Sequence, residues 1–262
     1  MAATIRSLLR DTLDNIRETG GVMVRAATVP AAIYFLIDLG GRYLLGDVGG
    51  LDSPAFWGSM GLSLAGVVLV SLFAVACHRR ALLGPSEPAV VRLGWREVRF
   101  LIVMVLIFLL VFLAMLSVQY VGRPLLLNLG LNGPLFSAAL GFMLGMFLFL
   151  RFCLALPAAA MDAPGGPRGA MGLSWTLTRG RFWMLLGAFL AVWLPMMAMM
   201  ALPLGLIQAS GLAAGLRSVV AAVEVLAEFG ATFVMAMFLS AAYRAFLAEA
   251  APGGTQPPVL GA

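Results

Sequence analysis

Two glutamates at helical spacing are the residues of this chain best placed for chemistry. Glu224 and Glu228 lie four positions apart in a long apolar run, so a helix would present both carboxylates on one face. Two ionised carboxylates at that spacing repel each other, so in apolar surroundings we expect one to be protonated or both to share a cation. Asp38 lies at a comparable depth in an earlier apolar run. Acids inside a membrane span point to an ion or proton path, whereas a helix–helix hydrogen bond or a water-filled vestibule is the structural alternative.

Six arginines near the ends of apolar runs form a second candidate site. Planar guanidinium groups hold phosphates through paired hydrogen bonds, so these arginines together could bind an anionic lipid headgroup. Arginines also set the orientation of a membrane protein, which accounts for most of them without a ligand. Arg151 is the exception, because apolar residues flank it and it requires snorkelling or a specific partner. The six are Arg79, Arg80, Arg151, Arg179, Arg181 and Arg244.

Sulfur-containing residues and catalytic motifs offer little further chemistry. Methionines at helical spacing suit a soft metal such as Cu(I), but methionine also fills gaps in apolar cores. Cys77, Cys153 and His78 are too few to close a zinc site. No nucleophile elbow, phosphate-binding glycine loop or HExxH motif is present, so we expect no enzyme activity, metal or cofactor. The methionines concerned are Met143, Met146, Met196, Met197, Met199 and Met200.

The composition places these residues in a membrane protein. Hydrophobic residues make up 62% of the 262 positions and charged residues only 11%, with a mean hydropathy of +1.01. A soluble domain is about half apolar and a quarter charged. All seventeen cations are arginine, which excludes lysine chemistry. A net charge of +5 on such a chain favours membrane lipids with anionic headgroups, and no nucleic acid, as partners.

Six apolar runs are long enough to cross a bilayer, which takes about 20 residues. The segment 1–20 carries apolar residues at helical spacing among charges, which predicts an interfacial amphipathic helix. We therefore expect this helix over 1–20, a transmembrane domain over 21–250 and a disordered tail over 251–262. The predicted spans are 26–45, 55–77, 99–119, 135–157, 182–206 and 219–246.

Small residues and prolines inside these runs predict how the helices pack. Pro30 and Pro195 fall within the first and fifth spans and should kink them. Gly141 and Gly145 form a GxxxG pattern in the fourth span, which favours close helix contact. The second span has a small face made of Ser59, Gly61, Ser63 and Ala65.

The placement of the arginines predicts the orientation. Fourteen lie on the side that carries both chain termini, and three lie on the other. Because cytoplasmic loops are rich in arginine and lysine, we expect both termini in the cytoplasm. The three on the other side are Arg42, Arg123 and Arg217.

A weak threefold repeat relates the ends of the spans. Arg79, Arg151 and Arg244 each have a leucine three residues on, at the ends of the second, fourth and sixth spans. Trp95 and Trp175 each precede an arginine by four residues before the third and fifth spans and are expected to anchor the interface. This pattern predicts an all-α fold of three transmembrane hairpins in a pseudo-symmetric bundle, each preceded by an interfacial amphipathic helix.

The segments HRRALLG, RFCLALPAAAMD and SWTLTRGRFWMLLG resemble a bacterial membrane-domain family. This domain is fused to some glycerophosphodiester phosphodiesterases and has stand-alone relatives of the YciC type. The resemblance covers most of residues 1–250 and implies a bundle of six spans in the bacterial inner membrane, without catalytic residues. The metal-binding acids and histidines of the phosphodiesterase domain are absent from this chain.

Two function classes follow from these observations. The first is a non-catalytic integral membrane protein, a scaffold or accessory subunit of another membrane protein or complex that contacts anionic lipid headgroups. The second is a transporter or proton-coupled channel that uses Glu224, Glu228 and Asp38. The third, fourth and fifth spans offer few ionisable residues that could continue a polar path across the membrane. This favours the first class.

Overall fold

The computed structural model describes residues 3–44, 53–88, 91–122, 134–209 and 216–250. Helices make up almost all of this part, and it contains no strand, which confirms the predicted all-α fold. The tail predicted over 251–262 lies outside the described residues. The elements are α1 (Ile5–Leu44), α2 (Pro54–Leu83), α3 (Trp95–Ser117), the π-helix η1 (Val118–Gly122), α5 (Pro134–Phe152), α6 (Ala155–Ala160), α7 (Gly166–Leu177), α8 (Phe182–Ala209) and α9 (Arg217–Ala250).

Six helical segments among the described residues are long and apolar enough to cross a membrane, so the chain is a multi-pass integral membrane protein. They match the six predicted runs one for one. The fourth crosses from α5 into α6 through a break at Cys153 and Leu154. The segments are Ile5–Tyr43, Pro54–Leu83, Trp95–Tyr120, Phe136–Ala160, Phe182–Leu202 and Ser218–Ala250.

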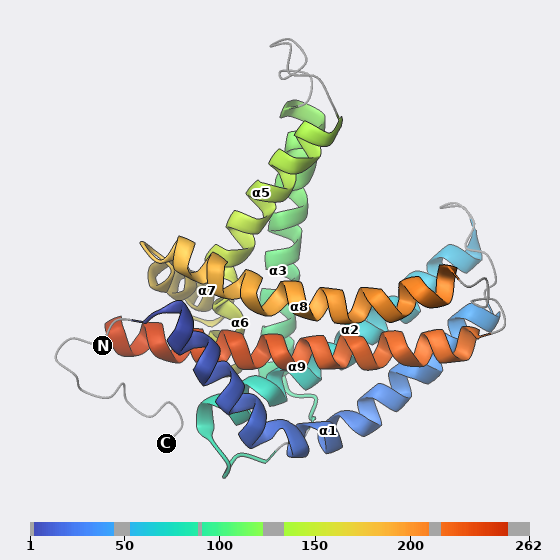
Figure 1. The fold of residues 1–262 in the computed structure, drawn as a ribbon, viewed down its shortest axis with the longest axis horizontal. Coiled ribbons are helices and arrows are strands. Elements are labelled where there is room, and N and C mark those ends of the chain that lie inside the picture. Colours follow the sequence, from blue (N-terminus) through green and yellow to red (C-terminus); the bar gives the residue numbers. More distant parts are fainter. Residues whose placement is uncertain (1–2, 45–52, 89–90, 123–133, 210–215, 251–262) are drawn as a thin grey trace.

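The hairpins do not repeat around one axis. In Figure 1, α2, α8, α9 and the second half of α1 run roughly side by side, whereas α3 and α5 pair with each other and leave them at a steep angle. The last helix, α9, packs against α1, α2 and α8. The first hairpin (α1 and α2) and the third (α8 and α9) therefore pack together, because α9 contacts both helices of the first hairpin. The predicted pseudo-symmetric bundle is thus replaced by a four-helix unit and a separate hairpin.

The predicted interfacial helices differ in the three units. Before α8, α7 is a separate short helix that buries Ala170, Ser174 and Leu177, as the sequence predicted. Before the first span, the predicted helix is continuous with α1, which changes direction between its two halves in Figure 1. That helix contains Pro30, a residue at which helices bend. Before α3, the described residues of 84–94 form turns and extended chain, so the prediction is wrong there.

The buried core gathers at one end of the molecule. We call this the α6–α7 end: it holds these two short helices, the C-terminal ends of α2, α5 and α9 and the N-terminal ends of α3 and α8. Leu150, Cys153, Leu154 and Leu177 are almost completely enclosed there. A second cluster lies between α1, α2 and α9 and includes Phe73 and the free thiol of Cys77. Many apolar side chains further along the spans are exposed, as expected for helices that face lipid.

Glycines allow close helix contact at two seams. An added Cβ at Gly145 would lie 3.2 Å from Val111, and one at Gly141 would lie 3.7 Å from the backbone of Met115, so the GxxxG pattern packs α5 on α3 as predicted. On α2 the close contact falls at Gly66, where an added Cβ would lie 2.5 Å from the ring of Tyr34. The predicted small face is wrong at Gly61, which has nothing within 4 Å.

The variant Gly66→Ala is expected to be about 2 kcal/mol less stable than Gly61→Ala. Both changes gain about 1 kcal/mol of helix propensity, but only the first forces Tyr34 away from α2. Unfolding midpoints in mixed detergent micelles, followed by tryptophan fluorescence, provide the comparison. Equal midpoints for the two variants would contradict the α1–α2 contact.

Candidate functional site

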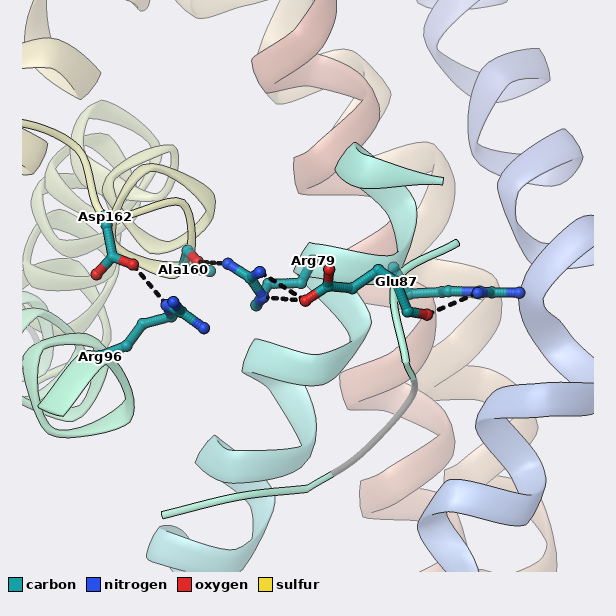
Figure 2. Close-up of polar contacts among 6 residues, drawn as sticks. Arg79, Glu87, Arg96, Ala160 and Asp162 are labelled. Carbon is teal, nitrogen blue, oxygen red and sulfur yellow. Dashed lines mark hydrogen bonds and ion pairs between the residues drawn. The ribbon is translucent and has the colours of Figure 1, made fainter. Parts of the chain in front are cut away.

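The arginines of the α6–α7 end mostly bind protein atoms. Figure 2 shows Arg79 between Glu87 and the carbonyl of Ala160. Its Nε lies 2.7 Å from the Glu87 carboxylate and its Nη1 lies 3.4 Å from the carbonyl, so it joins the end of α2 to the end of α6. Arg80 donates to the backbone carbonyls of Pro85 and Glu87. Both arginines therefore fold the turn after α2 back onto the helix ends.

Asp162 binds the start of α3 to the loop between α6 and α7. Figure 2 shows the Asp162 carboxylate paired with Arg96, whose Nε lies 2.5 Å away. Nη1 of Arg99 lies 3.8 Å from the same carboxylate. The backbone of Asp162 adopts a positive φ of 54°, and Gly165 follows in the left-handed region at 83°. The loop between α6 and α7 thus turns the chain from one helix into the next, and its Asp162 carboxylate pairs with arginines of α3.

A second pair of arginines ties α9 to its neighbours. Arg181 lies 2.8 Å from Glu249, donates to the carbonyl of Leu177 and covers the ring of Phe246 at 5.0 Å. Arg244 donates to the carbonyl of Ala81 at the end of α2. These side chains hold α2, α7, α8 and α9 together. Their described hydrogen bonds and ion pairs are all to protein atoms.

Arg151 differs from these arginines because two of its nitrogens are buried without a partner among the described residues, whereas in Arg80 only Nε is. The Arg151 guanidinium lies 5.3 Å from the ring of Phe147 and 4.8 Å from the ring of Trp175. Its Nε and Nη1 are buried and have no hydrogen-bond partner among the described residues, although the whole side chain is only half-buried. Its own carbonyl accepts from Ser174 and Thr178, at 2.8 and 3.3 Å. The cation is therefore fixed in place by α7 while two of its donors lack an acceptor.

Two other predicted residues lie exposed at the same end. Arg179 is exposed in the turn after α7, four residues beyond Trp175. Trp95 begins α3, is 67% exposed and lies 5.9 Å from the guanidinium of Arg99. Trp95 and Trp175 thus lie on the surface of the α6–α7 end, where a tryptophan that anchors an interface belongs.

The structure brings two of the three intramembrane acids onto one cation. Arg42 Nε lies 2.8 Å from Asp38 of the same helix, and the Arg42 guanidinium also pairs with Glu224 of α9. Glu228 is not part of this ion pair and lies near the hydroxyl of Tyr34. The sequence placed Arg42 on the opposite side as an orientation signal and missed this role. The signal was present, since Asp38 and Arg42 are four residues apart.

A large apolar cleft lies between α2, α3, α8 and α9, with contributions from α5 and α6. Its volume is about 950 Å³, and its lining is mostly phenylalanine, methionine and aliphatic residues. Among the described residues of the lining, the ionisable ones are Glu228 and His78. His78 is buried, and its Nδ1 lies 2.8 Å from the hydroxyl of Ser240. The sequence does not reveal the contact between His78 and Ser240, because 162 positions separate the two residues.

The methionines do not gather around one point. Met196 and Met197 line the cleft, whereas Met143 and Met199 are exposed. Within the part of the chain that the structure describes, no group of three or more histidine, cysteine or acidic residues could hold a metal. Gap-filling therefore accounts for Met196 and Met197.

No protein-family model, curated protein or solved structure matches this chain. The resemblance to the bacterial membrane-domain family stays a prediction.

Proposed function

We propose that this protein is a non-catalytic integral membrane protein that binds an anionic phospholipid at its α6–α7 end. The observation that carries the proposal is the pair of unpartnered nitrogens, Nε and Nη1, on Arg151. A buried donor without an acceptor costs about 1–3 kcal/mol, and more when the donor is charged. A phosphate oxygen supplies a charged acceptor and offsets the positive charge.

The surroundings of Arg151 favour a lipid phosphate. Trp175 is 42% exposed beside the guanidinium, and Trp183 at the start of α8 is 78% exposed. Tryptophan favours the headgroup level of a bilayer, where phosphates lie. Arg179 is exposed four residues after Trp175 and supplies a second positive charge at the α6–α7 end. The proposed headgroup site therefore centres on Arg151, and Arg179 adds positive charge at the same end of the molecule.

The same proposal includes the location and the role. The arginine bias and the family resemblance support a bacterial inner-membrane protein with both termini in the cytoplasm, which puts Arg151 at the cytoplasmic leaflet. That leaflet is rich in anionic lipid. A scaffold or accessory role for another membrane protein fits a chain whose charged side chains mostly hold its own helices together. The transport alternative loses support, because Asp38 and Glu224 are both engaged in ion pairs with Arg42.

Arg151→Gln is expected to lower the bound phosphatidylglycerol about tenfold, since charge-assisted hydrogen bonds contribute about 1.5–3 kcal/mol. The measurement is native mass spectrometry of protein taken from nanodiscs that contain phosphatidylglycerol and phosphatidylethanolamine. The matched control is Arg168→Gln, because Arg168 is exposed on α7 and makes the same change in charge. An equal loss of phosphatidylglycerol in both variants would mean that only the overall positive charge attracts the lipid. If Arg151→Gln bound as much phosphatidylglycerol as the unchanged protein, the proposal would be overturned.

A further inference from the structure

The apolar cleft between α2, α3, α8 and α9 has the properties of a second lipid site. Its volume of about 950 Å³ lies at the upper end of the range of about 300–1,000 Å³ for small-molecule sites. Such sites are mostly apolar with a few placed polar groups, which matches the lining described above. Arg151, Trp175 and Arg179 do not line this cleft, so it is separate from the proposed phosphate site.

The polar groups of the cleft are held in place by the protein. The ring of His78 is fixed by the hydrogen bond between its Nδ1 and the hydroxyl of Ser240 and by Phe100, whose ring lies 5.8 Å away. Glu228 lies near the hydroxyl of Tyr34. No described residue bonds to Nε2 of His78, so this nitrogen is left for a ligand at the α6–α7 end of the cleft.

The charges select the kind of headgroup. The described lining contains the carboxyl group of Glu228 and no arginine, so an anionic headgroup would find no cation there. Neutral histidine has one donor and one acceptor nitrogen. With Nδ1 engaged by the Ser240 hydroxyl, Nε2 acts as the donor or the acceptor according to the tautomer. A hydroxyl group pairs with either form, and a carbonyl group pairs with the donor form.

The remaining lining fits a long flexible chain. Phe108, Phe112 and Trp193 supply broad apolar walls, and Met104, Met196 and Met197 supply side chains that adapt to an irregular ligand. The cleft runs between helices that are apolar enough to span the membrane, so a lipid can enter from the bilayer without crossing water.

We infer that this cleft binds a neutral long-chain lipid, with its apolar chain along α3 and α8 and its hydroxyl or carbonyl end on His78. This ligand differs in headgroup charge and in location from the anionic phospholipid proposed for Arg151. The two sites are therefore tested by different variants and different probes.

The test is photolabelling of the purified protein with hexadecanol that carries a diazirine in its chain. Labelled peptides are mapped by mass spectrometry, and excess unlabelled hexadecanol defines the specific part of the labelling. Ala231→Leu, which adds bulk to the cleft wall, should lower specific labelling of the α3 and α8 peptides about tenfold. The control is Ala32→Leu, which adds the same bulk in a separate groove between α1 and α9 and should leave the labelling unchanged.

A second variant tests the polar end. His78→Ala should lower specific labelling about fivefold, because it removes one hydrogen bond to the hydroxyl. His78 is buried, so its fold is checked by the unfolding midpoint, and Ala231→Leu decides the question if the histidine variant does not fold. Full labelling of Ala231→Leu would overturn the inference. So would a diazirine-bearing phosphatidylglycerol that labels the cleft as strongly as hexadecanol. A failure to detect phosphatidylglycerol at Arg151 would contradict the proposed function and would not affect the inference about the cleft.

Discussion

Arg42→Gln is expected to lower the free energy of unfolding by about 3 kcal/mol. The change leaves Asp38 and Glu224 without their shared cation in a helix pair that spans the membrane. Removing one partner of a fully buried ion pair costs about 3–5 kcal/mol. The lower end of this range applies, because these side chains are about a third exposed, at 27% to 39%. The measurement is the unfolding midpoint in mixed micelles.

The matched control removes the acids as well. A triple variant that adds Asp38→Asn and Glu224→Gln to Arg42→Gln has no unpaired charge, so it should recover most of the lost stability. If the triple variant were as unstable as the single one, the ion pair would not be the cause.

The sequence predicted the class of fold because hydropathy is a local property. Each of the six spans is marked by its own apolar run, and α7 is marked by its own loop and amphipathic pattern. Contacts within a few residues were also open to prediction, as the spacing of Asp38 and Arg42 illustrates. The interpretation of Arg42 failed because an arginine outside the predicted cytoplasmic side was treated only as an orientation signal.

The arrangement of the helices could not be predicted, because it depends on pairs far apart in the chain. Arg42 meets Glu224 across 182 positions, and His78 meets Ser240 across 162. Nothing local indicates that α9 packs against both helices of the first hairpin, or that α3 and α5 run at a steep angle to the other spans. The arginines at the α6–α7 end illustrate the same limit, since Arg96 and Arg181 find their acids in other helices or loops.

Gly169→Ala is expected to destabilise the protein by about 3 kcal/mol and to weaken phosphatidylglycerol binding as much as Arg151→Gln does. An added Cβ at Gly169 would overlap the carbonyl oxygen of Pro164, a backbone atom that cannot rotate away. The first turn of α7 would have to open, at the upper end of the cost of about 1–3 kcal/mol for overpacking. Because α7 carries Trp175, which covers the Arg151 guanidinium, its displacement would release that cation.

The control for this prediction lies one turn further along the same helix. Gly172 has nothing within 4 Å of an added Cβ, so Gly172→Ala should stabilise α7 by up to about 1 kcal/mol through helix propensity. Unfolding midpoints measure the first effect, and native mass spectrometry with phosphatidylglycerol measures the second. If Gly169→Ala lost stability but kept its lipid, α7 would hold the fold without positioning Arg151. If both properties matched those of Gly172→Ala, the close contact between Gly169 and the loop after α6 would be contradicted.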